Sequence, residues 1–277
     1  MIKHFIREVS FPYFARREGY PGIMRDMADL EESQFWPRER ILELQASRLG
    51  KLLVHAYENT SFYRKTFDLS GFNPYTFRHA DELRKLPVLT KDIIRANLED
   101  LVASNLLRKQ IHVAETGGTS GVKMRFFRDN KCLIVKEAGI YRFGRGAGWE
   151  IGEPMGMVWP AHQDFTGYRT FRSKIKNALY KRLVFYPAAV MDDGASARYL
   201  RELARKKPSM ILAFSSPIYE LARYIRQNGI SGVQVKGVVS TGEPLYRAQR
   251  ELIEEAFHCR VYDSYRSREA GPLAQEC

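Results

Sequence analysis

Residues 210–239 read MILAFSSPIYELARYIRQNGISGVQVKGVV, a short apolar run, an amphipathic segment and a second run rich in valine. Between the two runs, apolar residues recur at the i, i+3, i+4, i+7 spacing of one helix face, at Ile218, Leu221, Ala222 and Ile225. We therefore expect a strand at Met210–Phe214, a helix at Pro217–Gln227 and a strand at Val235–Val239. Two strands joined by a helix of this length form a βαβ unit with parallel strands.

The same alternation of short runs and helices extends over residues 101–277. Further elements are predicted as strands at Met124–Phe127, Met155–Trp159 and Arg260–Tyr262 and as a helix at Tyr246–Phe257. Before residue 101 the sequence is mainly helical, with one helix at Pro37–Tyr57 and another that begins after Thr90 as N-cap. We predict an α/β fold with a helical segment, residues 1–100, and a largely parallel sheet in residues 101–277. Loops at the carboxyl ends of such strands bind ligands.

The composition, 44% hydrophobic and 27% charged among 277 residues, is that of an ordinary soluble protein. No stretch reaches the roughly 20 apolar residues of a membrane-spanning helix, and the N-terminal MIKHFIRE becomes charged too early for a secretory signal. Three widely spaced cysteines, Cys132, Cys259 and Cys277, argue against a disulfide scaffold and favour a reducing compartment. The spacing of His258 to these cysteines matches no zinc site. We expect a cytoplasmic protein.

Lysine and arginine outnumber aspartate and glutamate by 44 to 32, which gives a formal net charge of +12. Part of this excess lies in Arg169–Arg182, where cationic residues surround Phe171, Ile175 and Leu179. Because these apolar residues recur at every fourth position, we predict a basic amphipathic helix. We favour a stripe packed against the protein over the alternative, a peripheral contact with an anionic membrane. No zinc-finger, helix-turn-helix or aromatic RNP pattern is present, so we expect no nucleic-acid partner.

Two polar segments with glycine suit a nucleotide. The first is Thr116-Gly117-Gly118-Thr119-Ser120-Gly121-Val122-Lys123, whose glycines allow close backbone approach to a phosphate and whose hydroxyls donate to its oxygens. It lacks the P-loop spacing, and an ordinary hairpin turn is the alternative. The second is Thr241-Gly242-Glu243-Pro244, between a buried strand and a helix. Its alternative is a turn in which Thr241 or Glu243 serves the N-terminus of that helix.

A third polar segment, residues 262–269, reads YDSYRSRE and is predicted to form the loop that ends the strand Arg260–Tyr262. An aromatic ring such as that of Tyr265 stacks on a base, and a carboxylate such as that of Glu269 holds Mg²⁺ through its oxygens. Each segment is a weak signal by itself, and their order along the chain is the stronger one.

Together, the three segments resemble the adenylate-forming superfamily, and specifically its phenylacetate–coenzyme A ligase-like branch, which includes capsule-biosynthesis-type members. Thr116–Gly121 is similar to the family's phosphate loop, Thr241–Leu245 to its adenine-side loop, and Tyr265–Glu269 to the Tyr-Gly-Ser-Arg-Glu of this branch. Residues 55–64, HAYENTSFYR, and 86–91, LPVLTK, are also family-like. The resemblance runs from Pro37 to the last residue.

This resemblance implies ATP-dependent activation of a small-molecule carboxylate to an acyl-adenylate, followed by acyl transfer, usually to coenzyme A. It implies Mg²⁺ held by Glu269, and for the capsule-type members a link to polysaccharide biosynthesis. The residues that it assigns to ATP or AMP are Thr116, Gly117, Gly118, Thr119, Ser120, Gly121, Lys123, Thr241, Gly242, Glu243, Pro244, Tyr262, Asp263, Tyr265 and Ser267.

The chain departs from the family pattern at two places. Arg266 stands where relatives have a glycine, which permits a positive φ and close backbone approach, so we expect it to impair ATP binding. The sequence ends at Cys277, before the family's ribose-binding aspartate and its mobile C-terminal domain. We therefore expect the incomplete N-terminal part of an AMP-binding domain, such as a truncated gene product, the first half of a split gene or a crippled paralogue; the alternative is that a partner chain carries the missing half. The alternative function is that of a non-catalytic nucleotide- or acyl-binding fragment.

Overall fold

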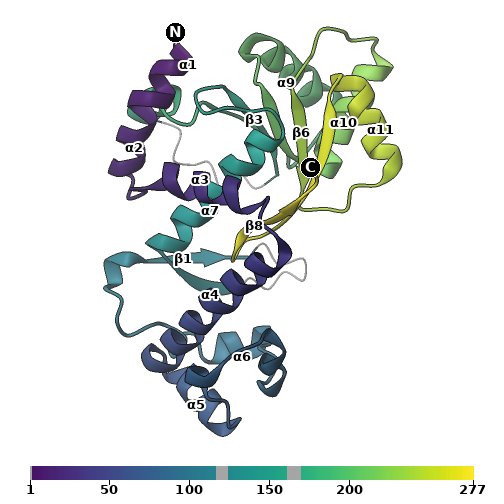
Figure 1. Cartoon of the computed structure of the whole chain (residues 1–277). Helices are drawn as coiled ribbons and strands as arrows, with labels where there is room; N and C mark the ends of the chain where they lie inside the picture. Colours follow the sequence, from purple (N-terminus) through teal and green to yellow (C-terminus); the bar gives the residue numbers. More distant parts are fainter. Residues whose placement is uncertain (1, 117–123, 161–169) are drawn as a thin grey trace. The chain divides into compact units, whose positions relative to one another are not determined.

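The computed structural model describes residues 2–116, 124–160 and 170–277. The chain divides into two compact units, one made of Met1–Met27 with Ile134–Cys277 and the other of Ala28–Leu133. Figure 1 shows the elements of both units along the chain. Within the described ranges, each helix is either too short or too polar to cross a bilayer.

The first unit is built on a six-stranded sheet with the order β4-β3-β5-β6-β7-β8. Neighbouring strands run parallel except β7 and β8, which are antiparallel. The strands are β3 (Met155–Trp159), β4 (Leu183–Pro187), β5 (Met210–Phe214), β6 (Gly237–Thr241), β7 (Arg260–Ser267) and β8 (Gly271–Gln275). The predicted largely parallel sheet of an α/β fold is therefore confirmed.

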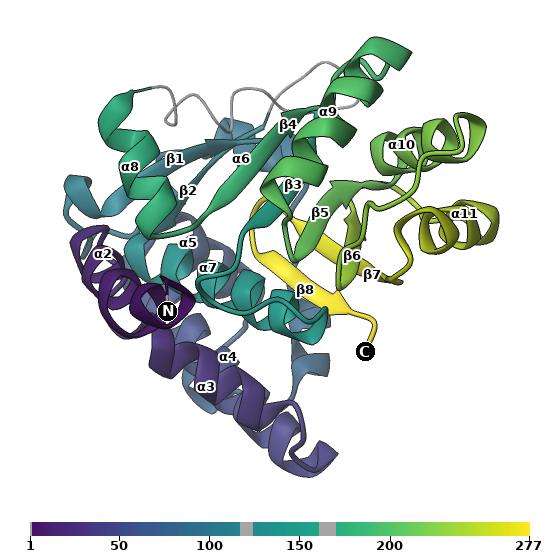
Figure 2. The same cartoon turned by 90° about the horizontal axis from the view of Figure 1, so that it is seen from above.

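Helices cover both faces of this sheet, as Figures 1 and 2 show. The helices of the unit are α1 (Ile2–Phe5), the π-helical turn η1 (Ile6–Ser10), α2 (Phe11–Arg17), α7 (Asn130–Gly146, from Ile134 on), α8 (Phe171–Leu179), α9 (Asp193–Lys206), α10 (Ser215–Gln227) and α11 (Arg247–Phe257). Ile211 and Ala213 belong to the core that α9, α10 and α11 share with the sheet. Met210 points to the opposite face, where its sulfur lies 3.7 Å from the position that a Cβ on Gly144 of α7 would take.

The strand β7 is longer than predicted. It was expected to end at Tyr262, with residues up to Glu269 in a loop, but it continues to Ser267. The reason is its partner β8, which pairs Ser264 with Gln275 and Ser267 with Gly271. The backbone groups of the polar segment up to Ser267 are therefore used in a strand ladder, which has a register shift between Tyr265 and Arg266.

The basic helix around residues 169–182 is confirmed as α8 over residues 171–179, whereas the packed apolar stripe is wrong. Phe171 is 78% exposed and Ile175 is 45% exposed. The helix is anchored by its C-terminal end, where the Leu179 carbonyl accepts from Ser10 Oγ at 2.5 Å and the buried Tyr180 ring lies 5.1 Å from that of Phe11. Its N-terminal residues Phe171, Arg172 and Lys174 are exposed.

Glu153, just before β3, connects Lys3 of α1 to Lys236, the residue that precedes β6. Its carboxylate accepts from Lys3 Nζ at 2.8 Å and from Lys236 Nζ at 2.8 Å. Burial disfavours the charged carboxylate, but these lysines and the Ser209 hydroxyl outweigh that penalty and lower the pKa of Glu153 to about 2. The N-terminal helix is thus held by an ion pair rather than by apolar contacts alone.

The second unit is mainly helical and carries a short two-stranded antiparallel sheet. Its elements are the end of α3 (Ile23–Ser33), α4 (Arg38–Asn59), α5 (Ser61–Leu69), η2 (Pro74–Thr76), η3 (Ala80–Lys85), α6 (Lys91–Ala96), η4 (Arg108–Gln110), β1 (Ile111–Glu115), β2 (Arg125–Asp129) and the first residues of α7. The predicted N-cap is confirmed, since Thr90 Oγ1 accepts from the Ile93 amide at 3.3 Å. Phe67, Phe72 and Phe77 form its core with Leu53.

Candidate functional site

The candidate site lies in the first unit, where β6 ends and the chain turns toward α11. Gly242 is the first residue of this turn and has a φ of +82°. A Cβ at this position would lie 2.5 Å from the ring of Phe214, the last residue of the neighbouring strand β5. Only glycine therefore fits here, both because of its backbone angle and because the turn rests on an aromatic ring.

Glu243 follows in the same turn and caps a helix, although not the predicted one. Its Oε2 accepts from the Ser216 amide at 2.8 Å, in the first turn of α10 rather than of α11. The Ser215 hydroxyl donates to the Glu243 carbonyl at 3.1 Å and lies 2.7 Å from the hydroxyl of Ser240, a buried residue of β6. The carboxylate compensates the positive end of the α10 dipole and fixes the turn between two parallel strands.

Thr241 connects the turn to the next strand. Its side chain is buried, and Oγ1 donates to the Ser264 carbonyl of β7 at 2.7 Å. This hydroxyl satisfies a backbone acceptor in the sheet, and Thr241 does not line the cavity beside the turn. Thr241 therefore contributes to the site indirectly, by linking the end of β6 to β7.

A cavity of about 640 Å³ opens beside this turn, between the loop after β6 and the strands β7 and β8. Its lining residues are Gly242, Glu243, Pro244, Asp263, Ser264, Tyr265, Arg266, Ala274, Gln275 and Glu276. The cavity falls within the usual volume range for small-molecule sites and lies at the carboxyl ends of two parallel strands. Five residues that the sequence assigned to a nucleotide are thus brought together: Gly242, Glu243, Pro244, Asp263 and Tyr265.

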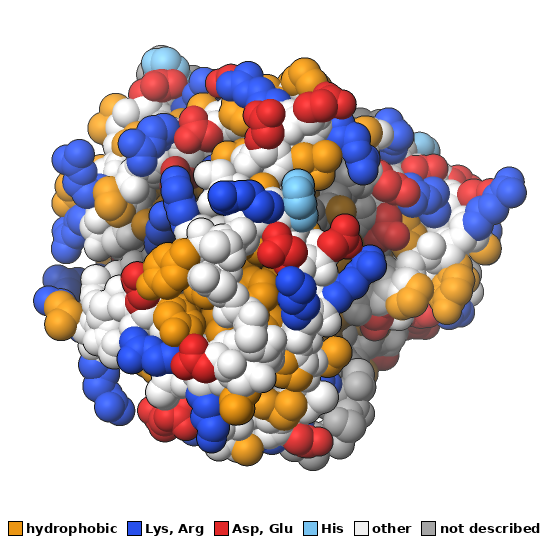
Figure 3. Space-filling view, turned by 60° about the horizontal axis from the view of Figure 1, so that its bottom comes forward, with side chains coloured by type: hydrophobic (Ala, Val, Ile, Leu, Met, Phe, Trp, Pro, Cys, Tyr) orange, Lys and Arg blue, Asp and Glu red, His pale blue; other side chains and the backbone are white. Residues whose placement is uncertain are grey.

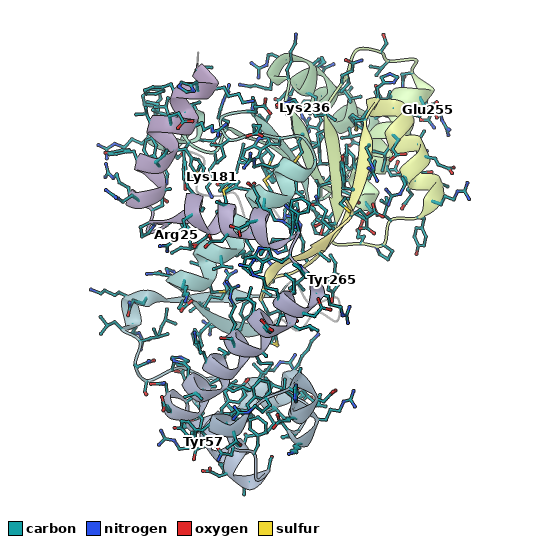
Figure 4. All side chains as sticks on the ribbon, viewed as in Figure 1. Arg25, Tyr57, Lys181, Lys236, Glu255 and Tyr265 are labelled. Atoms are coloured by element: carbon teal, nitrogen blue, oxygen red, sulfur yellow. The ribbon has the colours of Figure 1, made fainter. Side chains whose placement is uncertain are left out.

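Tyr265 gives the cavity an aromatic wall. Its side chain is 70% exposed and projects from β7, as Figure 4 shows. An exposed ring beside the turn that begins at Gly242 and contains Pro244 offers a flat surface on which a base can stack.

The part of the cavity wall that contains Glu276 is fixed by an ion pair. Glu276 accepts from Arg250 Nη2 at 2.8 Å and from the Asp263 amide at 2.9 Å. Burial would raise the pKa of Glu276, but the Asp263 amide and Arg250 lower it below its ordinary value. This carboxylate is therefore occupied within the protein. The sequence did not predict Arg250, Ala274 or Glu276 as site residues. Ala274 and Glu276 reach the cavity only because the end of the chain pairs with β7, and local sequence does not reveal this pairing.

Other predicted residues lie elsewhere in the unit. The Tyr262 ring lies 3.1 Å from the position of a Cβ on Gly237, toward the beginning of β6 and away from the cavity. Ser267 Oγ accepts from the Ala270 amide at 3.0 Å within the turn between β7 and β8. Glu269 is exposed in that same turn and does not line the cavity.

Thr116 belongs to the second unit and closes the pairing of β1 with β2. Its amide donates to the Met124 carbonyl at 2.9 Å, and its Oγ1 accepts from the Met124 amide at 3.1 Å. The rest of the predicted phosphate segment, Gly117, Gly118, Thr119, Ser120, Gly121 and Lys123, lies outside the described residues. The described flanks, β1 and β2, pair as antiparallel strands, and both interpretations of this segment stay predictions.

Comparisons with known proteins agree with this architecture. No family model matches the chain. The chain is 29% identical over 245 residues to the phenylacetate-coenzyme A ligase of Escherichia coli strain K12, covering 86% of this chain and 54% of that protein. It is 25% identical over 248 residues to protein CapK of Staphylococcus aureus, covering 85% of this chain and 52% of that protein.

A solved structure has the same fold. The crystal structure of 2-hydroxyisobutyryl-CoA ligase in complex with 2-HIB-AMP and CoA matches with a TM-score of 0.63 at 23% identity, over 82% of this chain and 49% of that one. This chain spans about half the length of the curated relatives that it matches. Its curated relatives and its fold point to the adenylate-forming superfamily, in the phenylacetate–coenzyme A ligase-like branch.

Proposed function

We propose that the cavity beside Gly242 and Tyr265 binds the nucleotide in an ATP-dependent activation of a carboxylic acid. In this reaction the carboxylate attacks the α-phosphate of ATP, pyrophosphate leaves, and the acyl group of the acyl-adenylate passes to the thiol of coenzyme A with release of AMP. The observation that carries the proposal is the cavity itself, which joins a glycine turn, an exposed aromatic ring and the carboxyl ends of two parallel strands. Relatives that are phenylacetate-coenzyme A ligases support the reaction class.

In this proposal the residues of the cavity bind and orient the nucleotide. The base stacks on Tyr265, and the turn at Gly242 and Pro244 limits the depth to which it enters. Glu243 keeps the turn in place through its bond to the Ser216 amide. Positioning of this kind lowers the barrier because the reacting groups lose less freedom in the transition state.

Mg²⁺ would be bound through the nucleotide phosphates and, as the family resemblance implies, the carboxylate of Glu269, which is exposed in the β7–β8 turn outside the lining of the cavity. Since Mg²⁺ at such sites is held by one or two carboxylates together with phosphate oxygens and water, a single carboxylate fits. When bound, the ion supplies charge stabilisation at the phosphates.

Calorimetric titration of the purified chain with AMP tests the nucleotide site. Replacement Tyr265→Ala should weaken binding by about 1–3 kcal/mol, the typical contribution of one base stacked on an aromatic ring. Tyr246→Ala is the matched control, because Tyr246 is 65% exposed at the start of α11 and does not line the cavity. Equal affinities of the two variants for AMP would contradict the proposed site.

Carboxylate-dependent exchange of pyrophosphate into ATP separates an enzyme from a nucleotide-binding fragment. Phenylacetate and 2-hydroxyisobutyrate are the first acids to test, because the names of a relative and of a solved structure point to them. AMP binding without exchange would favour the non-catalytic alternative. A chain that supplies the remaining half of the fold, and a link to capsule polysaccharide biosynthesis, stay predictions.

A second candidate function, contact with an anionic membrane surface, is favoured by the exposed side of α8. Phe171 is 78% exposed on a helix that also carries Arg172 and Lys174. On the face of the molecule drawn in Figure 3, in contrast, cationic and anionic side chains are interspersed. Co-sedimentation with phosphatidylserine vesicles should fall for Phe171→Ser but not for Phe35→Ser, a control at a residue that is 83% exposed. Equal sedimentation of both variants would exclude this surface.

A further inference from the structure

Arg266 occupies an unusual place in the wall of the cavity. It lies in β7 at the irregularity between Tyr265 and Arg266, and its partner in β8 is Pro272, which has no amide hydrogen to donate. The side chain is partly buried and lines the cavity together with Tyr265 and the turn at Gly242. In the family pattern this position is a glycine, which contributes no charge to the cavity.

The guanidinium of Arg266 has one protein partner among the described residues. Nε donates to Ser264 Oγ at 2.9 Å, and the Ser264 hydroxyl in turn faces the Ala274 carbonyl at 3.4 Å. The terminal nitrogens have no hydrogen bond or ion pair within the described parts of the chain. A neutral hydroxyl therefore fixes the direction of the guanidinium without neutralising it.

Glu243, Asp263 and Glu276 also line the cavity, and among the described residues none of their carboxylates forms an ion pair with Arg266. Glu243 is bound to the Ser216 amide, and Glu276 is bound to Arg250 and to the Asp263 amide. Burial lowers the pKa of Arg266 to about 10, so the side chain still carries its proton at neutral pH. A cation that has lost part of its hydration and forms no ion pair with these carboxylates is stabilised by any anion that enters the cavity.

We propose that Arg266 is an anion-binding residue of the cavity that donates to the phosphate of a nucleotide and makes the site prefer AMP to adenosine. This inference rests on the proposed function, in which the cavity binds a nucleotide. The planar guanidinium presents paired N–H donors that match two oxygens of a phosphate. The ring of Tyr265 next to it in the chain would hold the base, so one strand would contact two parts of the ligand.

The proposed role of Arg266 is the opposite of the impaired ATP binding that the sequence predicted. Arginine in place of glycine suggested a side chain that fills the nucleotide site, whereas the hydrogen bond to Ser264 holds it along the wall. The cavity of about 640 Å³ remains open with this side chain in place.

The test is calorimetric titration of the intact chain and two variants with adenosine, AMP, inorganic phosphate and pyrophosphate. Arg266→Gln removes the charge and keeps a polar side chain, although a shorter one. Arg247→Gln removes the same charge from an exposed residue of α11 that pairs with Glu251. We expect Arg266→Gln to bind AMP about 10- to 100-fold more weakly, the range for a lost charge-assisted hydrogen bond, with adenosine unchanged. Arg247→Gln should behave as the unaltered chain.

Equal affinities of the unaltered chain for AMP and adenosine would overturn the inference about Arg266 but would not contradict the proposed nucleotide site. This comparison needs only the unaltered chain, so it holds even if Arg266→Gln fails to fold. Tighter AMP binding by Arg266→Gln would also overturn it, because the arginine would then be blocking the site. A third outcome is that the chain binds pyrophosphate through Arg266 but binds neither adenosine nor AMP. This result would contradict the proposed function and the nucleotide preference, and it would indicate a site for free phosphate groups. No binding of any of the four ligands would overturn both proposals.

Discussion

Replacement of Gly242 by alanine should be one of the most destabilising single-methyl additions in the first unit. The glycine has a φ of +82°, which costs an L-residue about 1–2 kcal/mol. Its new Cβ would lie 2.5, 2.7 and 2.8 Å from three atoms of the Phe214 ring. That ring has little room to retreat, because it packs edge-on against Trp159 at 4.6 Å between centroids. Overpacking of this kind costs about 1–3 kcal/mol.

The expected loss is therefore about 2–5 kcal/mol of unfolding free energy, a large part of the roughly 5–15 kcal/mol of an ordinary domain. Gly232→Ala is the matched control, because Gly232 has a φ of +86° and no atom within 4 Å of its Cβ position. The control should show only the backbone cost. Urea denaturation followed by tryptophan fluorescence and circular dichroism measures both variants.

Equal destabilisation by Gly242→Ala and Gly232→Ala would refute the packing argument. A double variant separates the ring from other causes: if the contact with Phe214 is responsible, Gly242→Ala should cost less in a Phe214→Leu background than in the unaltered chain. Additive effects of the two substitutions would mean that the turn does not rest on the ring.

Two further predictions concern titratable groups of the same unit. The pKa of Glu153 is lowered from 4.5 to about 2, which corresponds to at most about 3 kcal/mol of stability, reduced by solvent screening because both lysines are about half exposed. This stability is present above pH 4.5 and is lost as the pH falls through 2. Glu153→Gln should remove this dependence from acid-unfolding curves, and an unchanged curve would contradict the ion pair with Lys236 and Lys3. Burial, with a smaller contribution from Glu254, raises the pKa of the Cys259 thiol to about 12. Mass spectrometry should therefore find iodoacetamide on the exposed Cys277 well before Cys259 in the folded chain, and comparable rates would refute the burial of Cys259.

Much of the fold could be predicted from local sequence patterns. The strands Met155–Trp159 and Met210–Phe214 have the predicted bounds, and α10 and α11 differ from prediction by at most two residues at either end. These elements are continuous apolar runs or strongly periodic helices, so each residue's environment follows from its near neighbours. Gly242 was also assigned correctly to a turn after a strand, since glycine at that position signals an unusual backbone angle.

The sequence by itself thus determined the parallel α/β architecture, the likeness to the phenylacetate–coenzyme A ligase-like branch and the position of the glycine turn. Only the tertiary structure decided which polar residues face the cavity. Strand β8 extends β7 past Tyr262, turns Tyr265 and Arg266 toward the cavity and brings Glu276 beside Arg250. Glu243 caps α10 rather than α11, because β5 and β6 are neighbours in the sheet. The physical reason is that these contacts join segments far apart in the chain, and no local spacing encodes which strand will pair at an edge.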